Sequence, residues 1–223
     1  MSYELYWISG SPYAWSAMFA MELKGLTYES RRLDPSKGEH KTPDYLAINP
    51  HGKVPVLKDN ESGAVIYETI AILAYLESKH PAPLLFGPNP EETGHIWQRV
   101  FELTNYAYDP IYNGINRPLF QGRAESDGDA IQAAASQCHE ALKWVDATLA
   151  HGAYLAGETL SAADVFYMPI VQGLSRAAAR EDAVPLKLGF LPLNKTYPDI
   201  AEWLKRMEAL PAYDNSYPPH WRA

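Results

Sequence analysis

Cysteine is nearly absent from this chain of 223 residues, which contains a single one, Cys138. One thiol excludes an internal disulfide and any zinc site built from four cysteines. The seven histidines show no ligand spacing such as His-Glu-x-x-His, so we expect no metal site. Cys138 belongs to an apolar helical pattern, and we interpret it as a small buried core residue rather than a catalytic thiol.

Basic residues are also scarce, with 19 Lys and Arg against 27 Asp and Glu and a net charge of -8. Binding of nucleic acid requires clustered positive charge, so we expect no nucleic-acid partner. No apolar run reaches the roughly 18 residues that cross a bilayer. The first residues lack the basic start of a signal peptide. We therefore expect a soluble, cytoplasmic protein with no membrane partner.

Prolines gather in one short segment, residues 81–90, which contains four of them. Such a segment cannot continue a helix or a central strand, and it stiffens the connection. The length of the chain allows two domains. The sequence therefore predicts a first domain at residues 1–80, a linker at 81–90 and a second domain at 91–223.

The first domain mixes strand and helix signals. Alternating or β-rich runs predict strands at residues 3–8, 28–33, 54–57 and 64–66. Helical patterns, the first opening with a proline, fall at residues 12–23, 42–48 and 68–79. The order βαβ followed by ββα predicts an α/β domain, a small mixed sheet with helices packed against it.

The second domain shows helical spacing alone. One apolar helix face recurs at intervals of three and four residues, through Ile131, Ala135, Cys138, Leu142, Val145 and Leu149. Ser161 and Asp164 are spaced as a capping box at the start of another helix. The Asp109-Pro110 step is expected to break or kink a helix that begins near Trp97. These patterns predict an all-α bundle.

Pro55 follows Val54 inside an apolar run, where a central strand would lose a ladder hydrogen bond. The sequence allows an edge strand, a bulge or a cis turn. A cis bond would turn the Val54 N–H and C=O out of the sheet, where an extended peptide can pair with them. Such a site would recognise peptide backbone.

Two helix starts carry candidate binding groups. Ser11 precedes Pro12, where its hydroxyl either caps the helix or donates to an anion such as a thiolate. Glu68 and Thr69 open another helix, where a carboxylate and a hydroxyl suit a ligand with both an ammonium and a carboxylate. Three nearby cations are available for a second carboxylate, namely His40, Lys41 and Lys53.

Taken together, these motifs resemble those of the cytosolic glutathione transferases, most closely the serine-type theta and phi classes. The resemblance spans nearly the whole chain and is densest over residues 3–80. The residues that carry it are Ser11-Pro12-Tyr13, His40-Lys41-Thr42-Pro43, Asn49 to Leu57, Tyr67-Glu68-Thr69 and Ser161-Ala162-Ala163-Asp164.

The resemblance implies a thioredoxin-like first domain, an all-helical second domain and a homodimer. It implies glutathione as co-substrate, bound through His40, Lys41, Lys53, Val54, Pro55, Glu68 and Thr69. Thr69 stands where the family most often has Ser. The activating hydroxyl is assigned to Ser11, with Ser9 and Tyr6 as alternatives. A pocket for a small hydrophobic electrophile is expected at Tyr13, Tyr106, Tyr108 and Tyr112.

The expected reaction is conjugation of the glutathione thiolate to that electrophile, typical of detoxification enzymes. Alternatives within the same fold are a non-catalytic glutathione-binding protein and a glutathione-dependent peroxidase, dehalogenase or ether-cleaving enzyme. The aromatic segment 213–221 is expected either to cover the electrophile pocket or to pack on the surface.

Overall fold

The computed structural model describes residues 2–222 and contains two compact units. One unit comprises the chain up to Leu85 together with the segment from Leu210 onward, and the other comprises Phe86–Ala209. The sequence had grouped residues 91–223, so the C-terminal segment corrects that prediction. It joins the first unit because its aromatic side chains pack around Trp15 of that unit.

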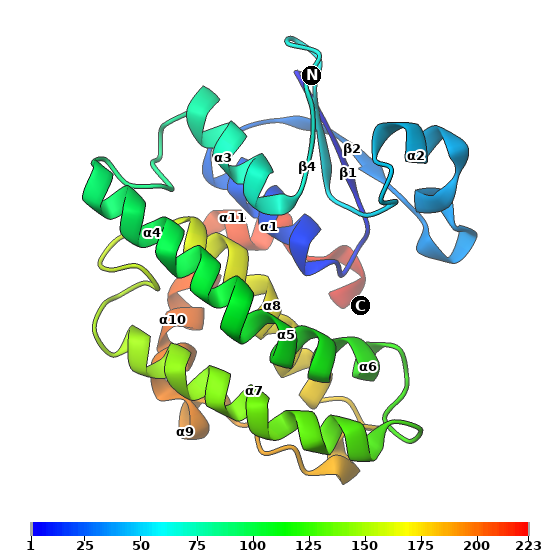
Figure 1. Cartoon of the computed structure of the whole chain (residues 1–223), viewed down its shortest axis with the longest axis vertical. Coiled ribbons are helices and arrows are strands. Elements are labelled where there is room, and N and C mark those ends of the chain that lie inside the picture. The colour runs from blue at the N-terminus through cyan, green and yellow to red at the C-terminus, as the bar shows by residue number, and fades with distance from the viewer. Residues whose placement is uncertain (1, 223) are drawn as a thin grey trace. The chain divides into compact units, whose positions relative to one another are not determined.

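The first unit is built on a four-stranded sheet in the order β2-β1-β3-β4 (Figure 1). Strand β1 pairs in parallel with β2, whereas β3 runs antiparallel to both β1 and β4. Leu5 and Leu57 face each other across β1 and β3 and are fully buried. The strand bounds are Tyr3–Trp7, Tyr28–Arg32, Val56–Asp59 and Val65–Tyr67 for β1 to β4.

Helices α1, Pro12–Leu23, and α3, Thr69–Lys79, lie side by side in the first unit (Figure 1). Helix α1 has Ser11 as N-cap and is buried over most of its length. Two 3-10 turns and a short helix follow β2, and two more elements close the chain. Their bounds are Pro35–Lys37 (η1), Glu39–Lys41 (η2), Pro43–Ile48 (α2), Pro211–Ser216 (α11) and Pro219–Trp221 (η6). The thioredoxin-like prediction is confirmed.

The second unit is entirely helical apart from one isolated bridge between Tyr154 and Gly157, among the residues described. The apolar face predicted from the sequence is buried along α7. The elements are Pro90–Glu102 (α4), Leu103–Ala107 (η3), Tyr108–Ile111 (α5), Tyr112–Asn116 (η4), Arg117–Phe120 (α6), Gly128–Leu149 (α7), Ala162–Ala178 (α8), Val184–Leu186 (η5), Leu193–Thr196 (α9) and Pro198–Glu208 (α10).

The sequence predicts a break or kink at Asp109-Pro110, and the structure shows a helix without a break. It continues from α4 through α5 to α6 by way of two π-helical turns, η3 and η4. Proline lacks the N–H that a regular turn needs, and wider turns on both sides let the chain stay helical. The insertion of π turns has no simple sequence signature.

The start of α8 depends on one buried carboxylate. Asp164 is fully buried and accepts hydrogen bonds at 2.8–2.9 Å from four donors. These donors are the Leu155 N–H, the Ser161 N–H and hydroxyl, and the Trp203 indole N–H. Burial raises the pKa of Asp164, and the donors oppose that rise. The predicted capping box is therefore one part of a larger network that also fastens α10.

We expect Asp164→Asn to lower the free energy of unfolding by about 2–4 kcal/mol, because the new amide N–H₂ faces groups that are themselves donors. Urea unfolding followed by circular dichroism measures this loss. Asp129→Asn, in the exposed first turn of α7, is the matched control and should change the free energy by less than about 0.5 kcal/mol. Equal losses in both variants would contradict the assignment.

Candidate functional site

The sheet topology brings three loops to one edge of the first unit. Tyr6 near the end of β1 pairs with Val56 at the start of β3, and Val56 pairs with Tyr67 at the end of β4. Strands β1 and β4 therefore end, and β3 begins, at the same edge. The starts of α1 and α3 and the Val54-Pro55 step are consequently neighbours, as the sequence motifs had required.

The two helix starts are linked and one of them is uncapped. The Thr69 hydroxyl, at the first position of α3, donates to the Tyr13 carbonyl of α1 at 3.3 Å. Glu68, the N-cap residue of α3, makes no side-chain capping hydrogen bond and has φ 71° and ψ 118°. A positive φ is strained for glutamate and is characteristic of functional sites. The free N–H groups of α3 form an anion-binding end.

The three candidate activating hydroxyls differ in their hydrogen bonds. Ser11 Oγ accepts from the Ala14 N–H at 3.3 Å, and within residues 2–222 its own proton reaches no protein acceptor. The Tyr6 hydroxyl donates to Glu4 at 3.2 Å, and burial, aided by Glu4, raises its pKa. Ser9 Oγ lies 2.5 Å from Nδ1 of His220. Ser11 is the hydroxyl whose proton is uncommitted.

The Val54-Pro55 peptide bond is cis, which confirms that alternative over an edge strand or a bulge. Sheet pairing begins at Val56, so Val54 lies just outside the ladder. The preceding carbonyl, of Lys53, accepts from the Tyr45 hydroxyl at 2.6 Å and from Asn49 Nδ2 at 2.9 Å. Tyr45 and Asn49 were not identified from the sequence, where a buried helical Tyr and a turn Asn look ordinary.

The predicted cations take different roles around this loop. The Lys41 ammonium binds backbone carbonyl groups: it donates to that of Gly52 at 2.9 Å and to that of His51 at 3.4 Å. A Cβ on Gly52 would lie 2.8 Å from the backbone carbonyl oxygen of His40, and Gly52 has φ +57°, so glycine is required there. Nδ1 of His40 is buried and has no hydrogen-bond partner in the described part of the chain. Such an orphaned atom fits a missing ligand.

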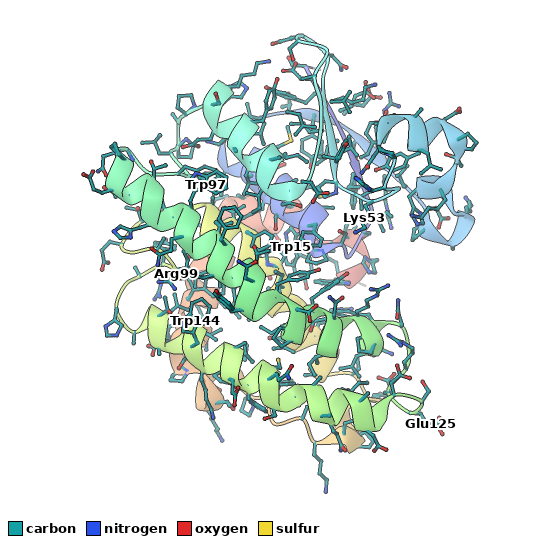
Figure 2. The ribbon with its side chains drawn as sticks, viewed as in Figure 1. Trp15, Lys53, Trp97, Arg99, Glu125 and Trp144 are labelled. Carbon is teal, nitrogen blue, oxygen red and sulfur yellow. The ribbon has the colours of Figure 1, made fainter. Side chains whose placement is uncertain are left out.

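Two charged side chains remain open to solvent at the same edge. Lys53, labelled in Figure 2, is exposed on the loop between α2 and β3. Glu68 is also exposed, beside the start of α3. Neither makes a side-chain hydrogen bond or ion pair among the residues described. The site thus offers one cation, one anion and a set of backbone donors.

The four predicted pocket tyrosines belong to different units. Tyr13 lies on α1 in the first unit and is half-buried. The other three lie on the helix with π turns in the second unit. Tyr108 and Tyr112 stack with ring centroids 5.1 Å apart, and burial raises the pKa of Tyr112. Tyr106 is 69% exposed.

The described residues contain neither a metal-binding cluster nor a membrane-spanning helix. No group of three or more His, Cys, Asp and Glu side chains in residues 2–222 is arranged to hold a metal ion. Within the same range, no helix has the length and apolar character needed to cross a membrane.

Comparison with known proteins gives matches over both units. Residues 10–79 match the glutathione S-transferase N-terminal domain and residues 128–206 match the glutathione S-transferase C-terminal domain. The chain is 31% identical to glutathione S-transferase A of Pleuronectes platessa, over 97% of this chain and 92% of that protein. It is 28% identical to maleylacetoacetate isomerase of Pseudomonas aeruginosa, over 82% of this chain and 86% of that protein.

A solved structure with the same fold contains a ligand. It is the glutathione transferase URE2P6 of Phanerochaete chrysosporium in complex with oxidized glutathione, with a TM-score of 0.80 and 27% identity over 96% of this chain and 94% of that one. Sequence, fold and the domain matches agree. The chain belongs to the glutathione S-transferase family.

Proposed function

We propose that this protein binds glutathione at the shared edge of the first unit and transfers its thiolate to a small hydrophobic electrophile. The observation that carries the proposal is the uncommitted hydroxyl proton of Ser11 at the start of α1. A hydroxyl donor and the positive end of a helix together favour a bound thiolate over the thiol. Ser11 is therefore proposed as the activating residue.

The tripeptide is proposed to lie across the three loops. Its ammonium pairs with Glu68, and its first carboxylate accepts from the free N–H groups of α3, including that of Thr69. The Thr69 hydroxyl already donates to Tyr13, so in this arrangement Thr69 contributes mainly its backbone. The cysteinyl backbone pairs with Val54 beside Pro55 as a short added strand.

The terminal carboxylate of glutathione is proposed to lie against Lys53 and His40, the exposed cation and the orphaned ring nitrogen. Lys41 donates to the backbone of residues 51–52, so we propose that it positions this loop and does not touch the ligand. Tyr45 and Asn49 act in the same way on the Lys53 carbonyl.

The chemical gain from Ser11 alone is modest. A thiol of pKa about 8.5 is about 3% ionised at pH 7, and a pKa lower by about two units makes it about three-quarters ionised. Nucleophilicity falls with basicity, by about eightfold for a Brønsted slope near 0.45, which leaves a net gain of about threefold. The larger contribution comes from holding the electrophile in line. The contacts of that electrophile stay a prediction, at Tyr13 in the first unit and at Tyr106, Tyr108 and Tyr112 in the second.

Ser11→Ala should reveal this activation as a change in pH dependence. If Ser11 supplies the whole two-unit shift, conjugation of a generic aryl halide falls about threefold at pH 7 and about tenfold at pH 6, and equals or exceeds the wild type above about pH 8. Steady-state kinetics at saturating glutathione measure it. A profile identical to the wild type would move the role to Ser9 or Tyr6.

The same assay separates the other functions that the fold allows. Glutathione binding without conjugation would favour the non-catalytic alternative, and turnover of an organic hydroperoxide would favour the peroxidase. Isomerisation, suggested by the isomerase relative, regenerates the thiol because the thiolate adds to a conjugated double bond and then leaves. Conjugation instead consumes one glutathione per turnover, so the final glutathione concentration distinguishes the two reactions.

Tyr45→Phe should weaken glutathione binding about fivefold with little change in kcat, because one hydrogen bond of about 1 kcal/mol to the Lys53 carbonyl is lost. Isothermal titration calorimetry measures the Kd. Tyr28→Phe is the matched control: it removes a phenolic hydroxyl in the same unit that makes no hydrogen bond among the described residues. Equal Kd values for the two variants would refute the positioning role.

We also propose a cytoplasmic homodimer. An exposed aromatic row on the second unit supports a partner surface: Phe101 is 55% exposed and stacks on Trp97, which Figure 2 labels on α4. Light scattering of the purified protein should give about twice the chain mass of 24.9 kDa. Phe101→Glu should shift the mass toward the monomer, and a monomeric wild type would end the proposal.

A further inference from the structure

The C-terminal segment is firmly attached to the first unit. Trp15 of α1 is 2% exposed, and its indole N–H donates to Ser216 Oγ at 3.0 Å in a buried bond. Three aromatic rings of the segment surround the Trp15 ring, with centroids 5.4–5.6 Å away, those of Tyr213, Tyr217 and Trp221. Figure 1 shows α11 against α1. The segment is therefore a packed part of this unit.

This packing brings His220 to the loop between β1 and α1. Nδ1 of His220 lies 2.5 Å from Ser9 Oγ. A Cβ on Gly10 would meet His220 Cε1 at 3.0 Å, and Gly10 has φ +86°. Glycine between Ser9 and Ser11 therefore permits both the turn and the close approach of the imidazole.

We propose that His220 is a positioning residue for the thiol site: it controls the direction of the Ser9 hydroxyl, so that Ser9 acts as a second donor beside Ser11 when Nδ1 carries a proton. The inference rests on the proposed function. It gives a role to the C-terminal segment, which follows the matched C-terminal domain at residues 128–206. It also gives a role to Ser9, which the family resemblance offers only as an alternative to Ser11.

The Ser9 hydroxyl has a single proton to donate. When Nδ1 is unprotonated, Ser9 must donate to it, and no Ser9 proton remains for another acceptor. When Nδ1 is protonated, it donates to Ser9 Oγ and the Ser9 proton is released toward the sulfur. His220 therefore switches Ser9 between two states without moving the loop.

The Ser9-His220 pair also borders a cavity. Both residues line a cavity of about 610 Å³ in the first unit, together with Ile8 and Leu33. The charged residues that line the same cavity are Arg32, Asp34, Lys37 and Glu39. On the segment of His220 itself, Arg222 pairs with Asp214 at 2.9 Å.

Most of these charged side chains have local partners. Asp34 accepts from Ser36 and lies 3.6 Å from Lys37. Glu39 accepts from the Asp34 N–H at 2.7 Å. Arg32 lies over the Trp7 ring. Hydrogen bonding and the neighbouring cation lower the pKa of Asp34. Among the described residues that line this cavity, His220 supplies the imidazole, the side-chain type whose ordinary pKa lies nearest neutral pH.

The test is a double-mutant cycle in the full-length protein at saturating glutathione. Ser9→Ala and His220→Phe are each expected to lower kcat/KM for a generic aryl halide about fivefold at pH 6, the value of about one hydrogen bond, with little effect above pH 8. The double variant should lose no more than either single one. Additive losses, or a wild-type profile in Ser9→Ala, would overturn the proposal.

Two further measurements separate a positioning role from a structural one. His220→Asn keeps a polar group near the Nδ1 position and cannot titrate, so in this background Ser9→Ala should change kcat/KM by the same factor at pH 6 and at pH 8. A Ser9→Ala effect that still differs between these two pH values would contradict the proposal. Trp fluorescence verifies that the segment stays packed around Trp15.

A readout without glutathione keeps the inference distinct from the proposed function. In an imidazole-labelled NMR titration, Ser9→Ala should shift the midpoint of His220, whereas Ser62→Ala, an exposed serine in the β3-β4 turn, should leave it unchanged. An unshifted midpoint in Ser9→Ala refutes the contact. If the protein fails to bind glutathione but the midpoint shifts, the proposed function fails while the Ser9-His220 contact stands.

Discussion

The first backbone N–H groups of a helix have no partners inside it, and the first unit collects two such helix ends at one edge of its sheet. Strands β1 and β4 run in the same direction because β3 is antiparallel to both. Helices α1 and α3, which follow them, therefore start side by side. The positive N-terminal ends of both helices therefore lie at the same edge of the sheet, where they favour a bound anion.

The loop before β3 lies at the same edge, and side-chain hydrogen bonds hold its backbone in place. Lys41 holds the carbonyls of His51 and Gly52, and Tyr45 and Asn49 hold that of Lys53. Strain at Glu68, with its positive φ, is maintained by the packed helix that follows. Rigid backbone on one side and exposed charges on the other are what a zwitterionic peptide requires.

The sequence predicted the fold well where local patterns decide structure. Proline punctuation, strand alternation and the helical face through Cys138 are local signals, and the elements they predict are present within a few residues. The positioning side chains could not be predicted. Whether Tyr45 packs in a core or reaches the Lys53 carbonyl depends on a contact across a turn, which carries no pattern of its own.

The same limit explains the two corrections. The C-terminal segment was grouped with the helices that precede it, because sequence order gives no sign that its aromatic residues belong with Trp15 of α1. At Pro110 the sequence predicts a break or a kink, because proline lacks the N–H of a regular helical turn. The chain instead stays helical through two π-helical turns, which depend on backbone geometry and carry no sequence pattern.

A unit built from two separated segments has a consequence for biosynthesis. Ser216 and Trp221, the partners of Trp15, are made about 200 residues after it. The helical unit lies wholly between them in the chain, so it can fold while they are still being made. The sheet unit reaches its final packing only after this second segment has left the ribosome, which reverses the usual order in which amino-terminal domains mature first.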